Sequence, residues 1–352
     1  FNALKLDQSV ARIKSRNIFG IVKTDVTDGS KKNLKLIDIS VEEKPTGEIS
    51  AGAGIGTTGG SFAFNITESN WLGKGIGLST SVDVSQETFS GGISVINPNY
   101  NFSGNALSYH VTNTKNDKPD SGFKNNIFST GIGTSFEQYK DLYLSPSLTI
   151  SHDDLKVEDS ASESLKKQKG KFTDLTFNYG LRLDKRNRVY APTDGYSSSF
   201  NQTLPIYADA PYIKNSVSYS KYKSFSENYI GKFKFYTAAI NGLNDEDVRI
   251  SKRVNLPTKK LRGFKAGGIG PKDGKDFVGG NYAMATNFEM SLPNFLPESS
   301  KTDVGLFLDF GNLWKVDYSD AIDDSNKIRS TVGANTSWTS PLGPMTFIFS
   351  RN

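Results

Sequence analysis

Residues 258–280, TKKLRGFKAGGIGPKDGKDFVGG, combine glycines with basic side chains, a combination that can bind nucleotide phosphates. A phosphate-binding loop of that kind needs GxxxxGK[ST] or GxGxxG between a strand and a helix. Here the GPK of residues 270–272 runs into an Asp-Gly pair, and no helical pattern follows. The spacing therefore excludes a nucleotide site, and the chemistry of this segment must depend on its one arginine, Arg262, in the sequence LRGF.

Catalytic and metal-binding groups are scarce in the rest of the chain. There is no cysteine, and the two histidines, His110 and His152, lack the neighbours that a nucleophile or a metal site requires. The formal net charge is +5, without a clustered basic stripe or a nucleic-acid-binding module. We therefore expect no enzyme, no cofactor, no metal and no nucleic-acid partner. Asp153, Asp154 and the lysines of residues 166–171 are expected in a solvated loop, where the lysines could meet lipid phosphates.

The composition suits a membrane β-structure better than a membrane helix. Hydrophobic residues make up 36% of the chain and the mean hydropathy is −0.45, so no segment approaches the ~18–20 apolar residues that a spanning helix needs. Glycine, phenylalanine and tyrosine are abundant, at 33, 23 and 15 residues, which fits strands with aromatic girdles. The low mean hydropathy is compatible with a membrane barrel because its strands are apolar only at every second position.

The first 46 residues have a different pattern from the rest. Residues 2–16 place apolar side chains at helical spacing, and GIVKTDVTDG and NLKLIDISVEE then form two predicted strands joined at an Asp-Gly turn. A helix and two strands are too few for an independent core. We interpret residues 1–46 as the back part of a small α+β module with EEKPTGE as the linker, and expect that the chain, which starts with Phe1, was cut from a longer one.

From Glu48 onward, segments of roughly ten residues alternate apolar and polar side chains between turn residues. In residues 304–310, Leu306 and Leu308 point to one face and Asp309 to the other, because side chains alternate across a strand. About fifteen such two-faced strands are predicted, at 48–57, 61–69, 75–87, 89–97, 104–114, 125–138, 141–152, 172–185, 195–205, 212–224, 228–242, 281–293, 302–313, 328–340 and 343–351.

Alternation alone leaves open a soluble β-sandwich, but three observations favour a transmembrane barrel. The strands approach the ~9–11 residues that a tilted strand needs to cross the hydrocarbon, their oily face carries large aromatics, and short turns alternate with longer loops. The short turns are NWLGKG, QYKD, SEN and SPLG, and the long loops are 114–124, 153–171, 243–280 and 314–327. Because single-chain bacterial barrels have an even strand number, we predict an all-β fold, an antiparallel sixteen-stranded barrel over residues 47–352 whose last strand lies beyond Asn352.

The 243–280 segment is too long for an ordinary connection, and such loops are either functional or disordered. Its charge-rich part, 244–253, is typical of disorder, whereas LRGF flanks an arginine with large apolar side chains. LRGF followed by IGPK and VGGN resembles the inserted loop of the outer-membrane protein assembly factor (BamA) family, which carries a [VIL]RG[FY] motif. EEKPTG, NWLGKG, PTDG, LDFGNLW and SPLGP are similar to further family signatures and occur in the same order.

The resemblance implies a barrel preceded by POTRA domains, with residues 1–46 as the C-terminal part of the last POTRA domain and the inserted loop 243–280 folded back into the lumen. The motif arginine would pack against acids that match Glu289 and Asp309 here. Alternation already puts both acids on the inner face, and an arginine fork suits carboxylates; the alternative is that both simply face lumen water. The implied motif residues are Leu261, Arg262, Gly263, Phe264, Ile269, Gly270, Pro271 and Lys272.

The first barrel strand, GEISAGAGIGTTGG, is dense in glycine, which weakens a strand and gives it little to pack. Unsatisfied backbone groups cost several kcal/mol each in lipid, so a weak seam is a liability unless it opens; the alternative is a bend that closes the barrel. In the family this strand is thought to part from the last one as a lateral gate for client strands. The implied gate residues are Ile49, Ala51, Gly52, Gly54, Ile55 and Gly56.

The function implied by the resemblance is assembly and insertion of outer-membrane β-barrel proteins, with the POTRA module binding unfolded strands by edge pairing. The implied partners are unfolded barrel proteins, accessory assembly lipoproteins and outer-membrane lipid including lipopolysaccharide. A two-partner secretion pore or a translocation-and-assembly-module transporter has similar loops and stays an alternative; a passive porin is a remoter one. The predicted location is the outer membrane of a Gram-negative bacterium, with residues 1–46 in the periplasm.

Overall fold

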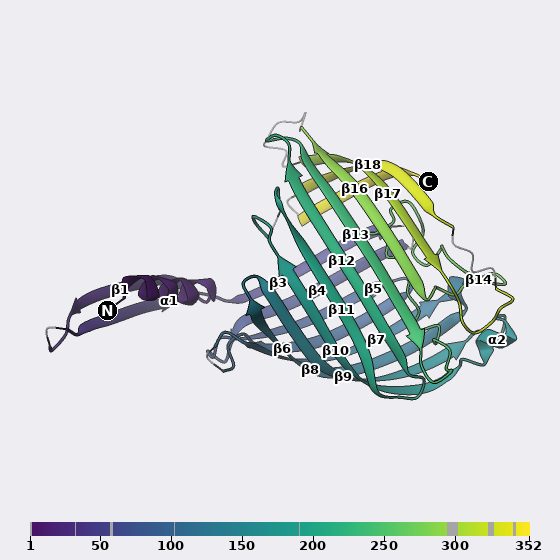
Figure 1. The fold of residues 1–352 in the computed structure, drawn as a ribbon, viewed down its shortest axis with the longest axis horizontal. Coiled ribbons are helices and arrows are strands. Elements are labelled where there is room, and N and C mark those ends of the chain that lie inside the picture. Colours follow the sequence, from purple (N-terminus) through teal and green to yellow (C-terminus); the bar gives the residue numbers. More distant parts are fainter. Residues whose placement is uncertain are drawn as a thin grey trace.

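The computed structural model describes residues 2–31, 33–56, 59–101, 103–189, 191–293, 302–322, 327–340 and 343–352. Most of them form one antiparallel sheet of fifteen strands that curls into a cylinder (Figure 1). In chain order its strands are β3 (Gly47–Gly56), β4 (Gly59–Trp71), β5 (Ile76–Ser85), β6 (Thr88–Asn97), β7 (Ala106–Lys118), β8 (Phe123–Tyr139), β9 (Leu142–Val157), β10 (Gly170–Asp184), β11 (Gly195–Ala208), β12 (Tyr212–Ser224), β13 (Ile230–Gly242), β16 (Tyr282–Leu292), β17 (Thr302–Trp314), β18 (Arg329–Ser340) and β19 (Gly343–Arg351).

Each of the fifteen segments predicted from alternation corresponds to one of these strands. Three predictions fall partly outside the described residues: residue 57 of the first strand, residues 323–326 of the loop 314–327, and residues 341–342 of the SPLGP motif. A single curled sheet replaces the two stacked sheets of a sandwich. The soluble-sandwich alternative is therefore wrong.

Side chains alternate between the two faces of the sheet, as the sequence predicts. On β17, Leu306 and Leu308 are 50% and 39% exposed on the outer face, whereas Phe307 and Asp309 are 3% and 0% exposed on the inner face. The outer face is thus apolar and open to the surroundings, and the inner face packs against something within the cylinder. This is the distribution of a barrel whose outer wall meets lipid.

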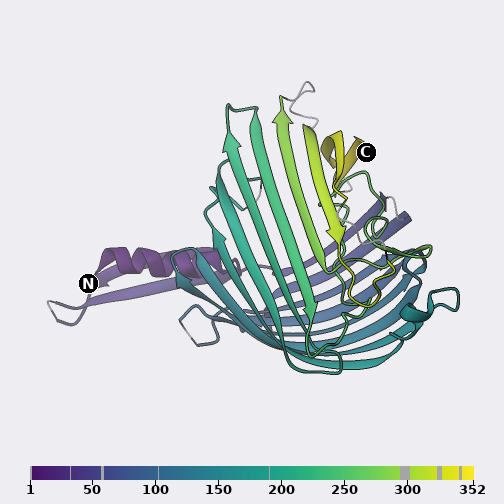
Figure 2. The same cartoon turned by 45° about the vertical axis from the view of Figure 1, so that its right-hand side comes forward.

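The connection from β13 to β16 is the feature that fills the interior. Residues 243–281 run from the rim into the cylinder (Figure 2) and include the short hairpin of β14 (Lys272–Asp273) and β15 (Asp276–Phe277). Buried apolar side chains of this segment contact inward-facing ones of the wall, including Ile240 and Leu313. The main hydrophobic core therefore lies between the loop and the inner faces of β12, β13, β16 and β17.

The connections at the two rims of the barrel differ less in length than the sequence suggests. Residues 114–124 are mostly strand and not a long loop, because β7 and β8 extend into them and are joined only by the 3-10 turn η1 (Pro119–Ser121). Lys124 and Asp117 form an ion pair of 2.8 Å across this extension, so polar side chains continue the ladder where their composition is typical of a loop. The next connection on this rim does contain a loop, with the short helix α2 (Glu163–Lys166) in it.

A small unit precedes the barrel. It consists of the helix α1 (Ala3–Ser15) and the hairpin of β1 (Phe19–Asp28) and β2 (Lys35–Glu43), as predicted, although β2 begins only at Lys35 and not directly after an Asp-Gly pair. The side chain of Asn2 caps the helix, because its Oδ1 accepts a hydrogen bond of 3.0 Å from the backbone N–H of Lys5. No helix among the described residues is long and apolar enough to span a membrane.

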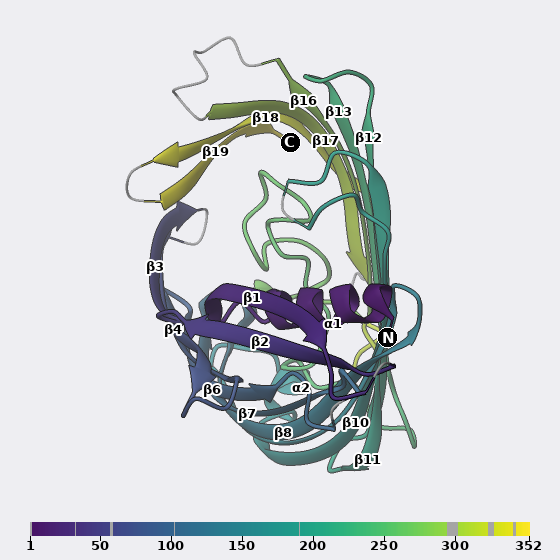
Figure 3. The ribbon, with the colours of Figure 1, turned by 90° about the vertical axis from the view of Figure 1, so that its left-hand side faces the viewer.

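This N-terminal unit projects outward from one open end of the cylinder (Figures 1 and 3). Arg16, which follows α1, donates from Nη2 to the carbonyl oxygen of Gly75 at 2.9 Å. Gly75 belongs to the NWLGKG turn between β4 and β5. The contact therefore marks the rim with the NWLGKG turn as the one that bears the N-terminal unit, whereas the inserted loop enters from the opposite rim.

The sheet has two free edges, β3 and β19, between which the described residues form no ladder. Figure 3 shows both edges on the same side of the cylinder. Neighbouring strands are antiparallel, so across fifteen strands β3 and β19 run in the same direction. A sixteenth strand would run antiparallel to both, and that strand stays a prediction.

Candidate functional site

Arg262 lies inside the barrel and pairs with two acids of the wall. Its Nε and Nη2 donate to the two carboxylate oxygens of Asp309 at 2.8 and 2.7 Å, and its Nη1 donates to Glu289 Oε2 at 3.0 Å. The backbone N–H of Arg262 adds a bond of 3.1 Å to Asp309. Asp309 is 0% exposed and Arg262 9%. The pair is therefore a bidentate fork in a site largely closed to water, and neither acid faces lumen water alone.

Both acids beside Arg262 are fully paired. Lys232 Nζ donates to Glu289 Oε1 at 2.9 Å, so each of the four carboxylate oxygens of Glu289 and Asp309 accepts from a cationic side chain. The guanidinium carbon of Arg262 also lies 3.6 Å from the ring centre of Phe307, a cation–π contact. Burying a charge is costly unless it is paired. The full pairing explains how four charged side chains can be enclosed between the loop and the wall.

The apolar residues of the motif hold the loop against the wall. Leu261 and Ile269 belong to the core between loop and barrel, and Phe264 packs against it. Pro271 is also buried. Lys272 is exposed, with its Nζ 4.2 Å from the ring centre of Phe277, so it lies outside the anchored part of the segment.

The two motif glycines occupy positions where a side chain would not fit. Gly263 and Gly270 have φ of 83° and 99°, a region that other residues adopt only with strain. A Cβ on Gly263 would lie 2.6 Å from Ser350 Oγ, and one on Gly270 would lie 2.8 Å from Leu313 Cδ2. These glycines let the loop backbone approach the wall closely enough for Arg262 to reach its acids.

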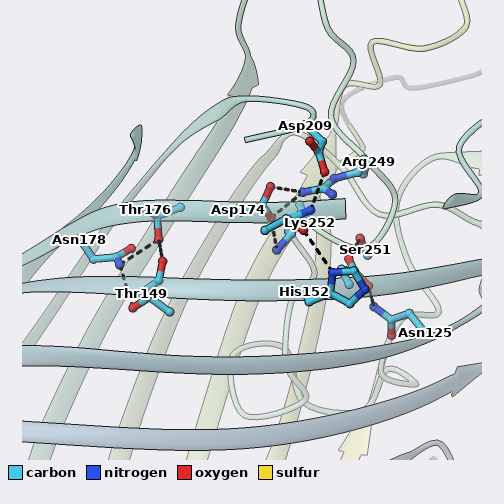
Figure 4. A network of polar contacts seen from close by, with 12 residues as sticks. Asn125, Thr149, His152, Asp174, Thr176, Asn178, Asp209, Arg249, Ser251 and Lys252 are labelled. Atoms are coloured by element: carbon cyan, nitrogen blue, oxygen red, sulfur yellow. Dashed lines mark hydrogen bonds and ion pairs between the residues drawn. The ribbon is translucent and has the colours of Figure 1, made fainter. Parts of the chain in front are cut away.

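A second polar anchor, which the sequence predictions missed, holds the start of the loop (Figure 4). Arg249 Nη2 donates to both oxygens of Asp174 at 2.8 and 2.7 Å, and Lys252 Nζ lies 3.0 Å from Asp174 Oδ2. The guanidinium of Arg249 lies 4.2 Å from the ring centre of Phe172. Arg249 and Asp174 are 3% and 0% exposed. The alternative that residues 244–253 are disordered is therefore wrong.

Asp153 belongs to the same region and corrects a further prediction. We expected it in a solvated loop, but it is 0% exposed and accepts hydrogen bonds from Ser251 Oγ at 2.6 Å and Asn125 Nδ2 at 2.8 Å. The reason is that β9 continues to Val157, so Asp153 occupies a strand position covered by the loop. Polar composition hid a strand end there, as it did in residues 114–124.

Arg253 makes a third contact between the loop and the rim. It forms an ion pair with Asp317, donates to Asn281 Oδ1 at 2.7 Å, and donates to the carbonyl oxygen of Val248 at 2.8 Å. Burial alone would raise the pKa of Asp317, but the nearby Arg253 and hydrogen bonds from Asn281 and the Val248 N–H stabilise the carboxylate more strongly. The pKa of Asp317 therefore lies below its ordinary value.

A weak signal for the second anchor was present in the sequence. Alternation in β10 puts Thr176 and Asn178 on the inner face, and one more step back puts Asp174 there as well. An acid at an inward position requires a cationic partner or water. What the sequence did not contain was the identity of that partner, because Arg249 lies 75 residues further along the chain.

The predicted gate residues lie apart from the loop anchors, on the edge strand β3. This strand pairs only with β4 among the described strands. Ile49 and Ile55 are 71% and 95% exposed, and Ala51 is exposed as well. A Cβ on Gly52 or Gly56 would meet nothing within 4 Å, and one on Gly54 would meet only Ser61 Oγ at 3.2 Å. The strand thus has one free edge and little side-chain packing.

The fold and the site together define an antiparallel β-barrel with an inserted loop pinned inside it by buried ion pairs. A family model described as the Omp85 superfamily domain matches residues 70–351. The chain therefore belongs to the Omp85 superfamily. It is an outer-membrane β-barrel protein.

Two relatives show which members of the superfamily have sequences similar to this chain. The outer membrane protein assembly factor BamA of Neorickettsia risticii is 26% identical over 352 residues, which cover 96% of this chain and 47% of that protein. A SAM50-like protein of Schizosaccharomyces pombe is 27% identical over 307 residues, 79% of this chain and 61% of that protein. This chain thus spans about half the length of the curated BamA relative.

Two solved structures have the same fold. BamA from Haemophilus ducreyi lacking POTRA domains 1-3 has a TM-score of 0.85 at 21% identity, covering 98% of this chain and 74% of that one. CdiB from Acinetobacter baumannii has a TM-score of 0.57 at 13% identity, covering 99% and 68%. The arrangement of the barrel is therefore closer to the BamA structure than to that of CdiB.

Proposed function

We propose that this chain is the barrel part of an assembly factor that folds and inserts β-barrel proteins into the outer membrane. The pairing of Arg262 with Glu289 and Asp309 is the observation that carries the proposal. A lumen filled by a pinned loop is unsuited to passive diffusion, which argues against a porin. The similarity to BamA proteins and to a SAM50-like protein supports the assembly role.

The pinned loop makes one side of the barrel rigid. Arg262 joins the loop to β16 through Glu289 and to β17 through Asp309, and Arg249 joins it to β10 through Asp174. Strands tied to a common internal loop cannot shift register independently. We infer that these tied strands serve as a fixed support while the seam between β3 and the last strand changes its pairing.

The seam is the proposed site of client insertion. When β3 parts from the predicted last strand, its edge exposes backbone N–H and C=O groups, and in lipid each such group is costly to leave unpaired. A client strand that adds to this edge satisfies those groups and enters the bilayer at the same time. Glycine at positions 52, 54 and 56 lowers the packing that would otherwise have to be broken.

The N-terminal unit gives the proposed orientation. Residues 1–46 would be the C-terminal part of a POTRA domain in the periplasm, so the rim with the NWLGKG turn would face the periplasm and the inserted loop would enter from outside. The further partners proposed are accessory assembly lipoproteins and outer-membrane lipid, lipopolysaccharide included.

The test uses the full-length protein in proteoliposomes with a urea-unfolded eight-stranded outer-membrane barrel as client. The chain has no cysteine, so a disulfide can be engineered between position 54 in β3 and the strand across the seam. We expect the oxidised protein to lose client insertion, measured by the heat-dependent gel shift of the folded client, and to regain it on reduction. Normal insertion with the disulfide formed contradicts the gate.

A matched control separates the seam from a general effect of cross-linking. Gly52 and Ala63 are directly paired in the β3–β4 hairpin, so a Gly52→Cys/Ala63→Cys disulfide ties strands that are already joined. That variant should insert clients normally. A transporter of the two-partner secretion type would instead move a secreted substrate across the same liposomes and leave the unfolded barrel uninserted.

A further inference from the structure

The outer face of the barrel carries an apolar groove of about 500 Å³ near the rim with the N-terminal unit. A row of outward side chains forms its floor, because Phe233 pairs with Phe288, Phe288 with Leu308, and Leu308 with Val332 on successive strands. Phe288 and Val332 are 46% and 57% exposed. The groove therefore lies on the side of the wall that meets lipid, behind the Arg262 anchor, whose Lys232, Glu289 and Phe307 also border it.

A glycine, Gly231, and the aromatic ring of Phe225 shape one end of the groove. Gly231 occupies an outward position of β13, where any other residue would fill the space. The ring of Phe225, from the turn before β13, lies over it: a Cβ on Gly231 would be 2.7 Å from Phe225 Cε2. Phe225 is 68% exposed and forms a wall of the groove without filling it. The result is an apolar channel with a defined end at the rim.

Two lysines stand at that end. Lys221 pairs with Phe233 and Lys223 pairs with Gly231 in the β12–β13 ladder, and both line the groove. Lys223 lies 3.3 Å from Asp194, whereas Lys221 has no ion pair within the described part of the chain. Lysine stems run along apolar surface and place the ammonium at the level of lipid headgroups. The rim end of the groove is therefore positively charged and its remainder is apolar.

We propose that this groove binds an anionic glycerophospholipid, with one acyl chain over Phe288 and Leu308 and the phosphate held by Lys221 and Lys223. Lys232 and Glu289 also border the groove but neutralise each other in an ion pair of 2.9 Å. An anionic lipid suits the site because the two remaining lysines face one carboxylate, Asp194, whereas a zwitterionic headgroup would bring a further positive charge. The choice of a glycerophospholipid of the periplasmic leaflet rests on the orientation proposed above. The existence of the groove and the positions of its charges are independent of that orientation.

A second hollow on the outer face shows why lysines alone are insufficient. It has a volume of about 410 Å³ and lies near the opposite rim. Its three lysines are offset by three acids, and Asp117 already pairs with Lys124 at 2.8 Å. The charged side chains that line it are Lys115, Lys124, Lys156, Glu87, Asp117 and Asp154. This hollow therefore lacks both the net charge and the long apolar floor, and its lysines make a matched control.

The experiment is native mass spectrometry of the full-length protein released from nanodiscs that contain phosphatidylglycerol and phosphatidylcholine. We expect retained phosphatidylglycerol in excess over phosphatidylcholine. A lysine near an anionic headgroup contributes roughly fivefold in affinity, so Lys221→Gln/Lys223→Gln should weaken retention of phosphatidylglycerol about tenfold or more. Lys115→Gln/Lys124→Gln should leave it unchanged. Equal retention in the two double variants overturns the assignment of the phosphate to Lys221 and Lys223.

The apolar part of the site has its own variant. Gly231→Leu fills the groove at the cost of moving only the exposed ring of Phe225, so the barrel should still fold. It should reduce retention of both lipids, whereas the lysine variant reduces that of the anionic lipid alone. Unchanged lipid retention in Gly231→Leu shows that no acyl chain lies there. The adducts are counted without a client protein, so loss of assembly activity and loss of lipid binding are separate results.

Discussion

The loop anchor and the first strand occupy opposite extremes of packing in the same barrel. At the anchor, Asp309 is 0% exposed and both of its carboxylate oxygens accept hydrogen bonds from Arg262. On β3, Ile55 is 95% exposed, and a Cβ on Gly52 would touch nothing. The wall is thus held firmly where charges are enclosed and loosely where glycine replaces larger side chains. The gate proposed above needs this asymmetry, since a uniformly packed wall has no preferred place to part.

The two regions also differ in what a substitution removes. At the anchor, losing one partner leaves an enclosed charge without its counterion, which is far more costly than losing an exposed contact. On β3, most side chains contribute little packing, so the energetic cost lies in the backbone ladder with β4. Substitutions should therefore act strongly at the anchor and weakly on β3.

The largest effect is expected for Arg262→Ala. The substitution leaves the carboxylate of Asp309 enclosed without its fork, and breaking such a pair costs about 3–5 kcal/mol. Arg262→Lys should be intermediate, because lysine keeps the charge but cannot donate as a planar fork. The measurement is equilibrium unfolding in urea with lipid vesicles. The control is Arg182→Ala, at a side chain that is 58% exposed. Equal losses of unfolding free energy in the two alanine variants would show that the Arg262 anchor stabilises the barrel no more than an exposed arginine does.

A smaller loss is expected for Arg249→Met at the second anchor. Lys252 still lies beside Asp174 after the substitution, so the acid keeps one counterion and the cost should be about 2 kcal/mol. Protease cleavage within residues 244–253 should also increase, because this part of the loop loses its tie to β10. Unchanged cleavage in Arg249→Met, with Arg262→Ala cleaved readily, would mean that the Arg262 anchor alone orders the whole loop.

The seam should be visible in amide hydrogen exchange. We expect residues 49–56 of β3 to exchange faster than residues 283–291 of β16 by roughly tenfold or more, which corresponds to about 1.4 kcal/mol in opening free energy. The physical reason is that the glycines of β3 give its ladder little side-chain packing, whereas Ala283 and Ala285 of β16 are buried and Glu289 is tied to Arg262. Equal protection of the two strands in the full-length protein would show that β3 opens no more easily than β16, contrary to the proposal of a weak seam.

The smallest effect is a dependence on acid pH at the third contact. The folded-state pKa of Asp317 is depressed, so the stability it contributes is present above its unfolded pKa, about 4, and is lost as the pH falls through the lower folded value. Exchange of residues 248–254 should therefore rise below about pH 4. Asp317→Asn should show faster exchange already at neutral pH and less change on acidification. A variant with the same acid response as the parent chain would exclude Asp317 as the titrating group.

Local pattern was enough for the strands because each one depends on neighbours two residues apart. Alternation assigned Leu306 outward and Asp309 inward, and burial agrees for both. The same local reasoning failed where strands leave the apolar belt. Around Asp117 and Lys124 both faces are polar, so the period-two signal disappears although the ladder continues. Asp153 was misplaced for the same reason.

In the candidate site, too, some residues could be predicted from local sequence and others could not. Arg262, Glu289 and Asp309 could be named in advance because a motif and an inward register both pointed to them. Asp174 could have been assigned to the lumen by extending the alternation of β10 by one step, but nothing local indicated Arg249 as its partner. The groove over Gly231 was equally invisible, because it depends on which residues of β13, β16, β17 and β18 become neighbours across the sheet.

The amino-acid sequence by itself determined that this chain forms two-faced strands with one long excursion, since the periodicity of side chains is a property of the local backbone. Curling those strands into a cylinder decided the rest: which acids the loop arginines reach, how completely they are closed off from water, and which strand keeps an open edge. Those outcomes depend on distances between residues far apart in the chain, and such distances exist only after the sheet has curled.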